Sequence, residues 1–376
     1  MKVTENRASS YRNMKIEAID DMQETVLHEP LAVAPHLLVK MVPKNKFQAT
    51  LAVVRNGDTF ACLMADLPTK GTEDYSIVNM KIIRIEAGNT TSSEVGTELS
   101  LNEPMDKYLF AAHPSKAAFL IASAKGKLVQ LNTDGVAVNY ATYATAGVSQ
   151  MKFEGNFLLW TGKEGKVLSV YDTINNHLLA SITNDSKVLD FTCLRQVTGS
   201  NTDILLVSIL NELGRLLVFR VSTSGIKLIA SSTYQLPAGS QFCGNNYEFN
   251  HLCSTNQFCS TKKSSAPKDC FFLQLKLESR NLVLKFTNRT ASNYEMTCRE
   301  LGDEKEGMET IVPSIQGQNE IVSLKNHQLY GRSVTTGRVQ QLVQGEFSEV
   351  KVFRGVLLLT NSHSEEQFIL TAAPKI

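Results

Sequence analysis

Side chains of the types that bind metal ions gather between positions 243 and 270. They are Cys243, His251, Cys253, Cys259 and Cys270. Zinc takes four such ligands, and a short pair such as C-x-x-C lets one turn hold two of them. The tightest spacings here are one residue between His251 and Cys253 and five residues between Cys253 and Cys259. We therefore predict unlinked thiols and no metal ion, with zinc and a disulfide as the alternatives.

The same stretch combines aromatic side chains with lysines. The candidate binding residues are Phe242, Tyr247, Phe249, Phe258, Lys262 and Lys263. Aromatic rings beside lysines can stack on bases while the lysines neutralise phosphates. Aromatic rings can equally anchor a protein partner, because they are enriched in the cores of interfaces. A third interpretation stays open, in which the rings fold back and are buried on their own sheet.

Motifs of the common enzymes are missing from the chain. The sequence has no G-x-x-x-x-G-K-[ST], G-x-G-x-x-G, H-E-x-x-H or G-x-S-x-G pattern. Its seven histidines are scattered, and no pair of carboxylates stands out as an acid and a base. We predict no catalytic residue, no cofactor, no small-molecule substrate and no enzymatic activity. An enzyme with its site in a central channel of the fold remains an alternative.

The elements that must position these residues are short β-strands. Apolar runs of four to eight residues alternate with turns, and turn signals near positions 57, 126, 165, 214, 280, 326 and 363 recur every 37 to 69 residues. This rhythm indicates four-stranded blades of about 40–45 residues, and a length of 376 residues leaves room for seven of them. We predict an all-β fold, a single seven-bladed β-propeller of four-stranded antiparallel blades.

The predicted organisation has three parts. Residues 1–15 are a polar N-terminal tail or a blade-closing segment, and residues 16–376 form the propeller. Residues 236–269 interrupt the strand pattern and form a loop insertion. The one stretch with some helical periodicity runs from Ile16 to Leu27.

Composition excludes several classes of protein. The chain is 43% hydrophobic and 20% charged, so it can bury a sizeable core. Its formal net charge is +1, which gives no overall attraction to nucleic acid or to an anionic membrane. The N-terminus lacks the apolar segment of a signal peptide, and no stretch is long enough to span a bilayer. Together with an odd number of cysteines, seven, this predicts a soluble intracellular protein.

A sequence unit between Phe153 and Ile182 carries a family resemblance. The segment Trp160 to Asp172 resembles the WD-repeat pattern, in which a turn of small residues precedes a strand ending in Trp-Asp, although Tyr171 replaces the tryptophan. A weaker match spans Leu206 to Val221, so the motif covers about 70 residues. In that family the aspartate forms hydrogen bonds that hold the turn within its blade, and most of the corresponding aspartates are missing from this sequence. We therefore expect apolar packing to hold neighbouring blades together.

The resemblance also implies a function. WD-like propellers are mostly non-enzymatic platforms, and diverged members are common in nuclear, nucleolar and trafficking assemblies. We therefore predict a protein–protein interaction scaffold, a subunit of a eukaryotic intracellular multiprotein complex in the nucleus or nucleolus. Its partners would be other proteins of that complex and not a membrane. Nucleic-acid binding through the insertion at 236–269 is the alternative.

Overall fold

A computed structural model gives the fold of this chain, and parts of the sequence lie outside its description. The described residues are 16–18, 36–40, 48–66, 79–87, 92–97, 99, 101, 103–196, 204–222, 225–233, 241–242, 270–276, 281–290, 293–301, 308–312, 320–333, 339–353, 356–364 and 366–372.

The described residues form seven hydrogen-bonded sheets, six of which have four strands. Three of these sheets are β3 (Gln48–Asn56), β4 (Thr59–Asp66), β5 (Met80–Glu86) and β6 (Ser92–Gly96); β7 (Tyr108–Ala112), β8 (Ala118–Ser123), β9 (Lys127–Asn132) and β10 (Ala137–Thr142); and β11 (Val148–Glu154), β12 (Phe157–Gly162), β13 (Val167–Asp172) and β14 (His177–Thr183). A short 3-10 turn, η2 (Met105–Lys107), precedes β7.

The other sheets follow in chain order. They are β15 (Val188–Gln196), β16 (Ile204–Asn211), β17 (Arg215–Ser222) and β18 (Gly225–Thr233); β19 (Gln241–Phe242), β20 (Cys270–Lys276), β21 (Asn281–Thr290) and β22 (Asn293–Leu301), joined by β1 (Ile16–Ala18); β23 (Met308–Val312), β24 (Glu320–Lys325), β25 (Gln328–Ser333) and β26 (Val339–Val343); and β27 (Phe347–Phe353), β28 (Val356–Asn361) and β29 (Gln367–Ala372), joined by β2 (His36–Lys40).

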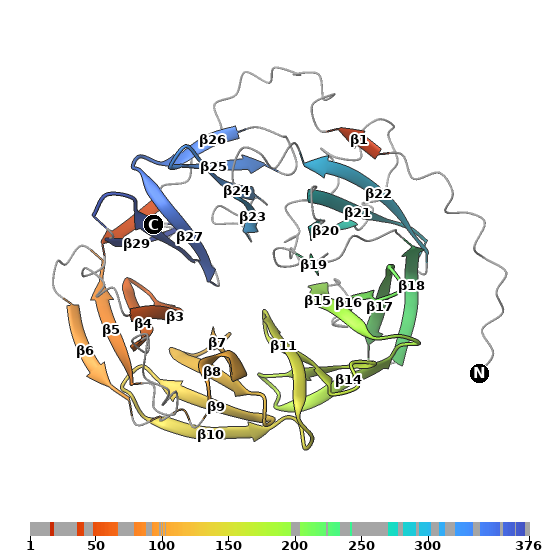
Figure 1. Cartoon of the computed structure of the whole chain (residues 1–376), viewed down its shortest axis with the longest axis horizontal. Coiled ribbons are helices and arrows are strands. Elements are labelled where there is room, and N and C mark those ends of the chain that lie inside the picture. Colours follow the sequence, from red (N-terminus) through yellow and green to blue (C-terminus); the bar gives the residue numbers. More distant parts are fainter. Residues whose placement is uncertain are drawn as a thin grey trace.

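The sheets follow one another around a ring in the order of the chain (Figure 1). The strands β3, β7, β11, β15, β19, β23 and β27 lie toward the centre, and the other strands of each sheet lie farther out (Figure 1). The strand β2, from the first part of the chain, and the last strand, β29, lie in one sheet, where Leu38 is opposite Leu370. This antiparallel pairing completes a four-stranded sheet from segments more than 300 residues apart in sequence.

Apolar side chains fill the spaces between neighbouring sheets. On β12, Leu158 and Trp160 pack with residues of the sheet β7–β10, whereas Leu159 packs with residues of the sheet β15–β18. Successive side chains of a strand point to opposite faces, so a strand between two sheets needs apolar residues at consecutive positions. This explains why the middle strands read as continuous apolar runs. The expected apolar packing between neighbouring sheets is therefore confirmed.

Backbone hydrogen bonds add a second link between sheets. Val148 N, at the start of β11, donates to Ala124 O in the β8–β9 turn at 2.9 Å. Val188 N, at the start of β15, donates in the same way to Gly165 O at 2.8 Å. Phe347 N repeats the contact with His327 O at 2.6 Å. The turn of one sheet thus holds the first strand of the next.

The strand prediction is confirmed at the level of an all-β chain with four-stranded antiparallel sheets. Two details differ from the sequence-based expectation. The sheet β19–β22 has a fifth strand, because β1 pairs with β22 in parallel and places Ile16 opposite Cys298. The helical periodicity assigned to Ile16–Leu27 is wrong at its start, where residues 16–18 form β1. Three residues cannot define a helical period, and pairing with a long edge strand supplies their backbone with partners.

The predicted tail and insertion are largely outside the described residues. Residues 1–15 lie entirely outside them, and the strand that completes the sheet of β27–β29 is β2. Within 236–269 only β19 is described, and it pairs with β20 through Gln241 and Lys276. That stretch therefore contributes a short strand to a sheet as well as a connection.

Candidate functional site

The binding residues predicted from sequence fall mostly beyond the described chain. Phe242 lies in β19, opposite Leu275 of β20. The positions outside the described residues are Tyr247, Phe249, Phe258, Lys262 and Lys263. Their role in binding a partner or a nucleic acid stays a prediction.

The candidate metal ligands also lie mostly outside the described residues. Cys243, His251, Cys253 and Cys259 lie outside the described residues, and Cys270 begins β20. In the part of the chain that the structure describes, no three His, Cys, Asp or Glu side chains lie close enough together to hold a metal ion. Cys62 and Cys193 are buried, and burial raises the pKa of Cys62 to about 12. Both sit in the core as small apolar groups.

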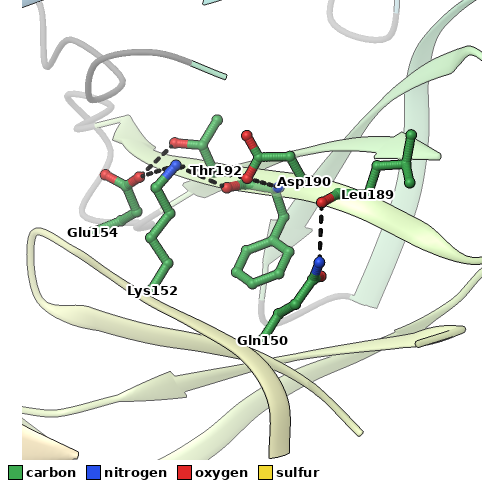
Figure 2. A network of polar contacts seen from close by, with 7 residues as sticks. Gln150, Lys152, Glu154, Leu189, Asp190 and Thr192 are labelled. Carbon is green, nitrogen blue, oxygen red and sulfur yellow. Dashed lines mark hydrogen bonds and ion pairs between the residues drawn. The ribbon is translucent and has the colours of Figure 1, made fainter. Parts of the chain in front are cut away.

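A polar network on the innermost strands was missed by sequence reasoning. Gln150 and Lys152 of β11 reach across to the backbone of β15 (Figure 2). Gln150 Nε2 donates to Leu189 O at 3.2 Å, and Lys152 Nζ donates to Phe191 O at 3.4 Å. Alternate residues of β11 point to the same side of the strand, which aims this set at the neighbouring sheet.

Glu154 completes the network at the end of β11 (Figure 2). Its Oε1 accepts a hydrogen bond from Thr192 Oγ1 at 2.9 Å and lies 3.4 Å from Lys152 Nζ. The same Nζ lies 3.8 Å from Asp190 Oδ1, so Lys152 forms ion pairs with two carboxylates. We call Gln150, Lys152, Glu154, Asp190 and Thr192 the inner tie.

Burial decides the electrostatics of the inner tie. The Glu154 side chain is 2% exposed, against 31% for Lys152 and 19% for Asp190. Burial raises the pKa of Glu154 from 4.5 to about 7, and the nearby Asp190 charge adds to the rise. The Lys152 charge and the hydrogen bonds from Thr192 and Lys152 lower that pKa without cancelling the effect of burial.

A carboxyl group with a pKa near 7 could in principle transfer protons. In Glu154 the carboxylate is buried, and its Oε1 is already engaged by Thr192 and Lys152. A reacting group would need hydrogen-bond reach to that carboxylate. The arrangement is suited to holding β11 against β15. The sequence places Lys152 and Glu154 at alternate positions before the apolar strand β12, which puts them on one face of β11 but does not identify their partners on β15.

A second feature lies where β12–β13, β14–β15 and β16–β17 connect. We call residues 162–167, 184–189 and 211–215 the turn surface. Asn184 N donates to Lys166 O at 2.8 Å, which joins the first two segments. Glu212 N donates to Lys187 O at 2.9 Å, and Lys187 N donates to Glu212 Oε1 at 3.1 Å, which joins the second and third. The three segments therefore form one hydrogen-bonded surface.

Exposed aliphatic side chains occur in several turns and outer strands. Among the residues whose side chains the structure describes, which exclude those of β19–β23, every large hydrophobic side chain that is exposed lies between positions 136 and 228. They are Val136, Val138, Val167, Ile174, Leu178, Leu179, Leu189, Leu213, Ile226 and Leu228. Three of them, Val167, Leu189 and Leu213, belong to the turn surface. The others lie on β10, β14 and β18, or in the turns that precede those strands.

The outer strands that carry these residues have irregular pairing. A register shift separates Asn139 from Ala141 in β10, and equivalent shifts interrupt the pairing of β14 with β13 and of β18 with β17. A bulge of this kind disturbs the row of backbone groups that an added strand would need. Contacts on these sheets would therefore depend on side chains.

In the described residues no helix has the length and apolarity needed to cross a membrane.

Solved structures resemble the chain only at low identity. Hydrazine synthase of Kuenenia stuttgartiensis aligns with a TM-score of 0.48 at 10% identity, over 88% of this chain and 98% of that chain. The Cps50 (Swd1) β-propeller domain of Myceliophteria thermophila aligns with a TM-score of 0.42 at 12% identity, over 87% and 100%. Raptor of Chaetomium thermophilum aligns with a TM-score of 0.46 at 10% identity, over 90% and 28%. No protein-family model and no curated protein sequence matches the chain.

Proposed function

We propose that the seven sheets are the blades of a single seven-bladed, WD-like β-propeller that serves as a non-enzymatic scaffold for protein–protein interactions. In this proposal it is a subunit of an intracellular multiprotein complex in a eukaryotic cell, located in the nucleus or nucleolus. Support for the architecture comes from the sheet order around the ring and from the pairing of β2 with β29.

The placement of exposed aliphatic side chains carries the proposal of a scaffold. Exposed apolar groups that cluster on a soluble chain mark surfaces for other molecules. Among the residues whose side chains the structure describes, they lie on three consecutive sheets, β7–β10, β11–β14 and β15–β18. The charged groups of the inner tie, by contrast, are engaged with one another between two of these sheets. In this proposal the binding surface lies on the outer strands and the turns. The polar side chains of the inner tie hold β11 against β15.

Paired variants test this proposal. One variant carries Leu178→Glu and Leu228→Glu on the outer strands, and a second carries Leu213→Glu on the turn surface. Tagged chains are purified from cells at moderate salt, and the co-purifying proteins are quantified. We expect at least one variant to lose partners, because a charge placed in an apolar contact is costly to bury. Ser181→Glu, at an exposed position of β14, is the matched control.

Two outcomes would contradict the proposal. If both variants retain every partner that the parent chain and the Ser181→Glu control retain, the exposed aliphatic side chains are not a scaffold surface. An experimental structure with six or eight sheets around the ring would contradict the blade count. Circular dichroism of each variant establishes that the sheets remain folded, so that a loss of partners reports on binding.

A further inference from the structure

We propose that the turn surface binds an acidic segment of a partner protein. The partner's carboxylates would pair with the lysines of this surface, and its apolar side chains would cover the exposed aliphatic groups. The inference rests on the proposed scaffold function and adds the place and the chemistry of one partner contact.

The turn surface is already organised before any partner binds. Besides the backbone bonds that join its three segments, Val188 N donates to Gly165 O at 2.8 Å. Asn211 is fully buried, and its Oδ1 accepts hydrogen bonds from Leu213 N at 3.1 Å and Arg215 N at 3.0 Å. A surface fixed in this way loses little conformational entropy on binding.

Three lysine side chains of the turn surface have no ion-pair partner among the described residues. Lys163, Lys166 and Lys187 are all exposed, and none forms a salt bridge with a residue that the structure describes. A Cβ added to Gly165 would lie 2.8 Å from Lys187 Cγ, so the Lys187 side chain passes directly over that turn. A Cβ added to Gly147 would lie 3.1 Å from Lys163 Cε. Two of the three lysine stems are thus held close to the backbone.

The neighbouring carboxylates are mostly engaged within the surface itself. Asp185 Oδ2 pairs with Arg215 Nη1 at 2.5 Å, and Asp185 Oδ1 accepts a hydrogen bond from Asn211 Nδ2 at 3.4 Å. Glu212 accepts the Lys187 N–H at 3.1 Å. Positive charge therefore remains available to a partner, and complementary charge steers association and fixes its register.

Exposed aliphatic side chains lie close in sequence to these lysines on the turn surface. Val167 is 40% exposed and directly follows Lys166, and Leu189 is 41% exposed two residues after Lys187. Leu213, at the tip of the β16–β17 turn, is 53% exposed. Burial of such groups supplies affinity, whereas exposed ion pairs alone contribute little. The fitting occupant is a segment that has both carboxylates and apolar anchors.

A nucleic acid fits this surface less well. The turn surface contains four basic residues (Lys163, Lys166, Lys187, Arg215) and three acidic residues (Glu164, Asp185, Glu212). Protein–nucleic acid affinity grows with the number of phosphates neutralised, and the acidic groups would repel a continuous phosphate backbone. A protein segment can place a few carboxylates at the lysines and avoid the acidic positions.

Site-specific photocross-linking in cells tests the inference. A benzoylphenylalanine side chain is introduced in place of Leu213, and Ser181, an exposed polar position of β14, serves as the control position. The cross-linked peptide is sequenced by mass spectrometry. We expect a segment with an excess of Asp and Glu beside aliphatic or aromatic residues. Cross-links to a neutral or basic segment, or to nucleic acid, would overturn the inference.

Charge variants of the same cross-linking chain give the second measurement. Replacing the three lysines by glutamate should lower the cross-link yield about tenfold or more, because three favourable contacts become repulsive. Replacing them by arginine keeps the charge and should keep the yield. Lys166→Glu alone, whose side chain makes no hydrogen bond with a described residue, separates binding from folding. An unchanged yield in the glutamate variants would overturn the inference.

The outcomes also separate this inference from the proposed function. Cross-links from Leu178 or Leu228 together with none from Leu213 would leave the scaffold proposal standing and overturn the acidic-segment contact. If none of the three positions gives more cross-links than an exposed polar position such as Ser181, both the scaffold proposal and the acidic-segment contact are overturned.

Discussion

Replacing Glu154 by glutamine should remove a pH dependence of folding stability that the inner tie creates. Burial raises the pKa of this carboxyl from 4.5 to about 7 in the folded chain. In the unfolded chain the carboxyl returns to its ordinary pKa. Between these two values the folded chain binds a proton that the unfolded chain does not bind, so the free energy of unfolding falls as pH rises through this window.

The size of the effect follows from the two pKa values. They differ by about 2.5, and each pKa unit corresponds to about 1.4 kcal/mol, so this carboxyl should make the chain about 3 kcal/mol less stable at pH 8 than at pH 4. Glutamine keeps an oxygen that can accept the Thr192 hydroxyl, now 2.9 Å from Glu154 Oε1, and it does not titrate. The variant should therefore be at least as stable as the parent at pH 8.

Urea denaturation followed by tryptophan fluorescence measures this change. The chain has one tryptophan, Trp160, which is buried in the sheet that contains Glu154. Midpoints are compared at pH 5, 6, 7 and 8 for the parent and for Glu154→Gln. We expect the parent midpoint to fall across this range more steeply than that of the variant.

A control shows whether burial is the cause. Glu349 pairs with Lys351 at 3.2 Å on the innermost strand β27, but its side chain is 49% exposed. Glu349→Gln should leave the pH dependence of the parent in place, because the buried carboxyl is still present. If the parent and Glu154→Gln have parallel midpoints from pH 5 to pH 8, Glu154 does not bind its proton as the burial argument requires.

Three further substitutions or reagents probe the turns and the core. Gly165→Ala should lower the free energy of unfolding by about 1–2 kcal/mol, because φ is 69° at this position; an unchanged urea midpoint would contradict that strain. Asn211→Ala should cost about 1–3 kcal/mol by leaving two turn N–H groups without their acceptor, and hydrogen exchange at Leu213 and Arg215 should quicken. Cys62 should react with a thiol reagent only in urea, since it is fully buried, and fast labelling of the native chain would contradict this.

Local strand structure could be predicted well from the sequence. Within the unit between Phe153 and Ile182, the apolar runs at Phe157–Trp160 and Val167–Tyr171 lie in the strands β12 and β13. The turn that contains Asn175 and Asn176 has four residues, 173–176, where two were expected, and Asn176 adopts φ 57°. These features depend on residues within a few positions of one another, where apolar burial and turn preferences act directly.

The inner tie could not be predicted in the same way. Lys152 and Asp190 are 38 residues apart, and their contact depends on how two sheets are placed side by side. It also depends on the register shifts between Val148 and Gln150 in β11 and between Val188 and Asp190 in β15. A single extra residue moves every later side chain to the opposite face of a strand. Sequence periodicity does not locate such a shift, so it cannot say which face Lys152 occupies.

The same irregularities help to explain where binding surface is available. Bulged pairing on β10, β14 and β18 makes the outer strands poor templates for an added strand, although they carry exposed groups such as Leu178 and Leu228. On the inner strands, the charged groups of the tie already engage one another. The turn surface differs from both, because backbone hydrogen bonds join its three segments while its lysines and aliphatic side chains are exposed. A partner recognised there would be selected by side-chain chemistry, which allows one rigid framework of sheets to acquire a specific partner through changes in a few turn residues.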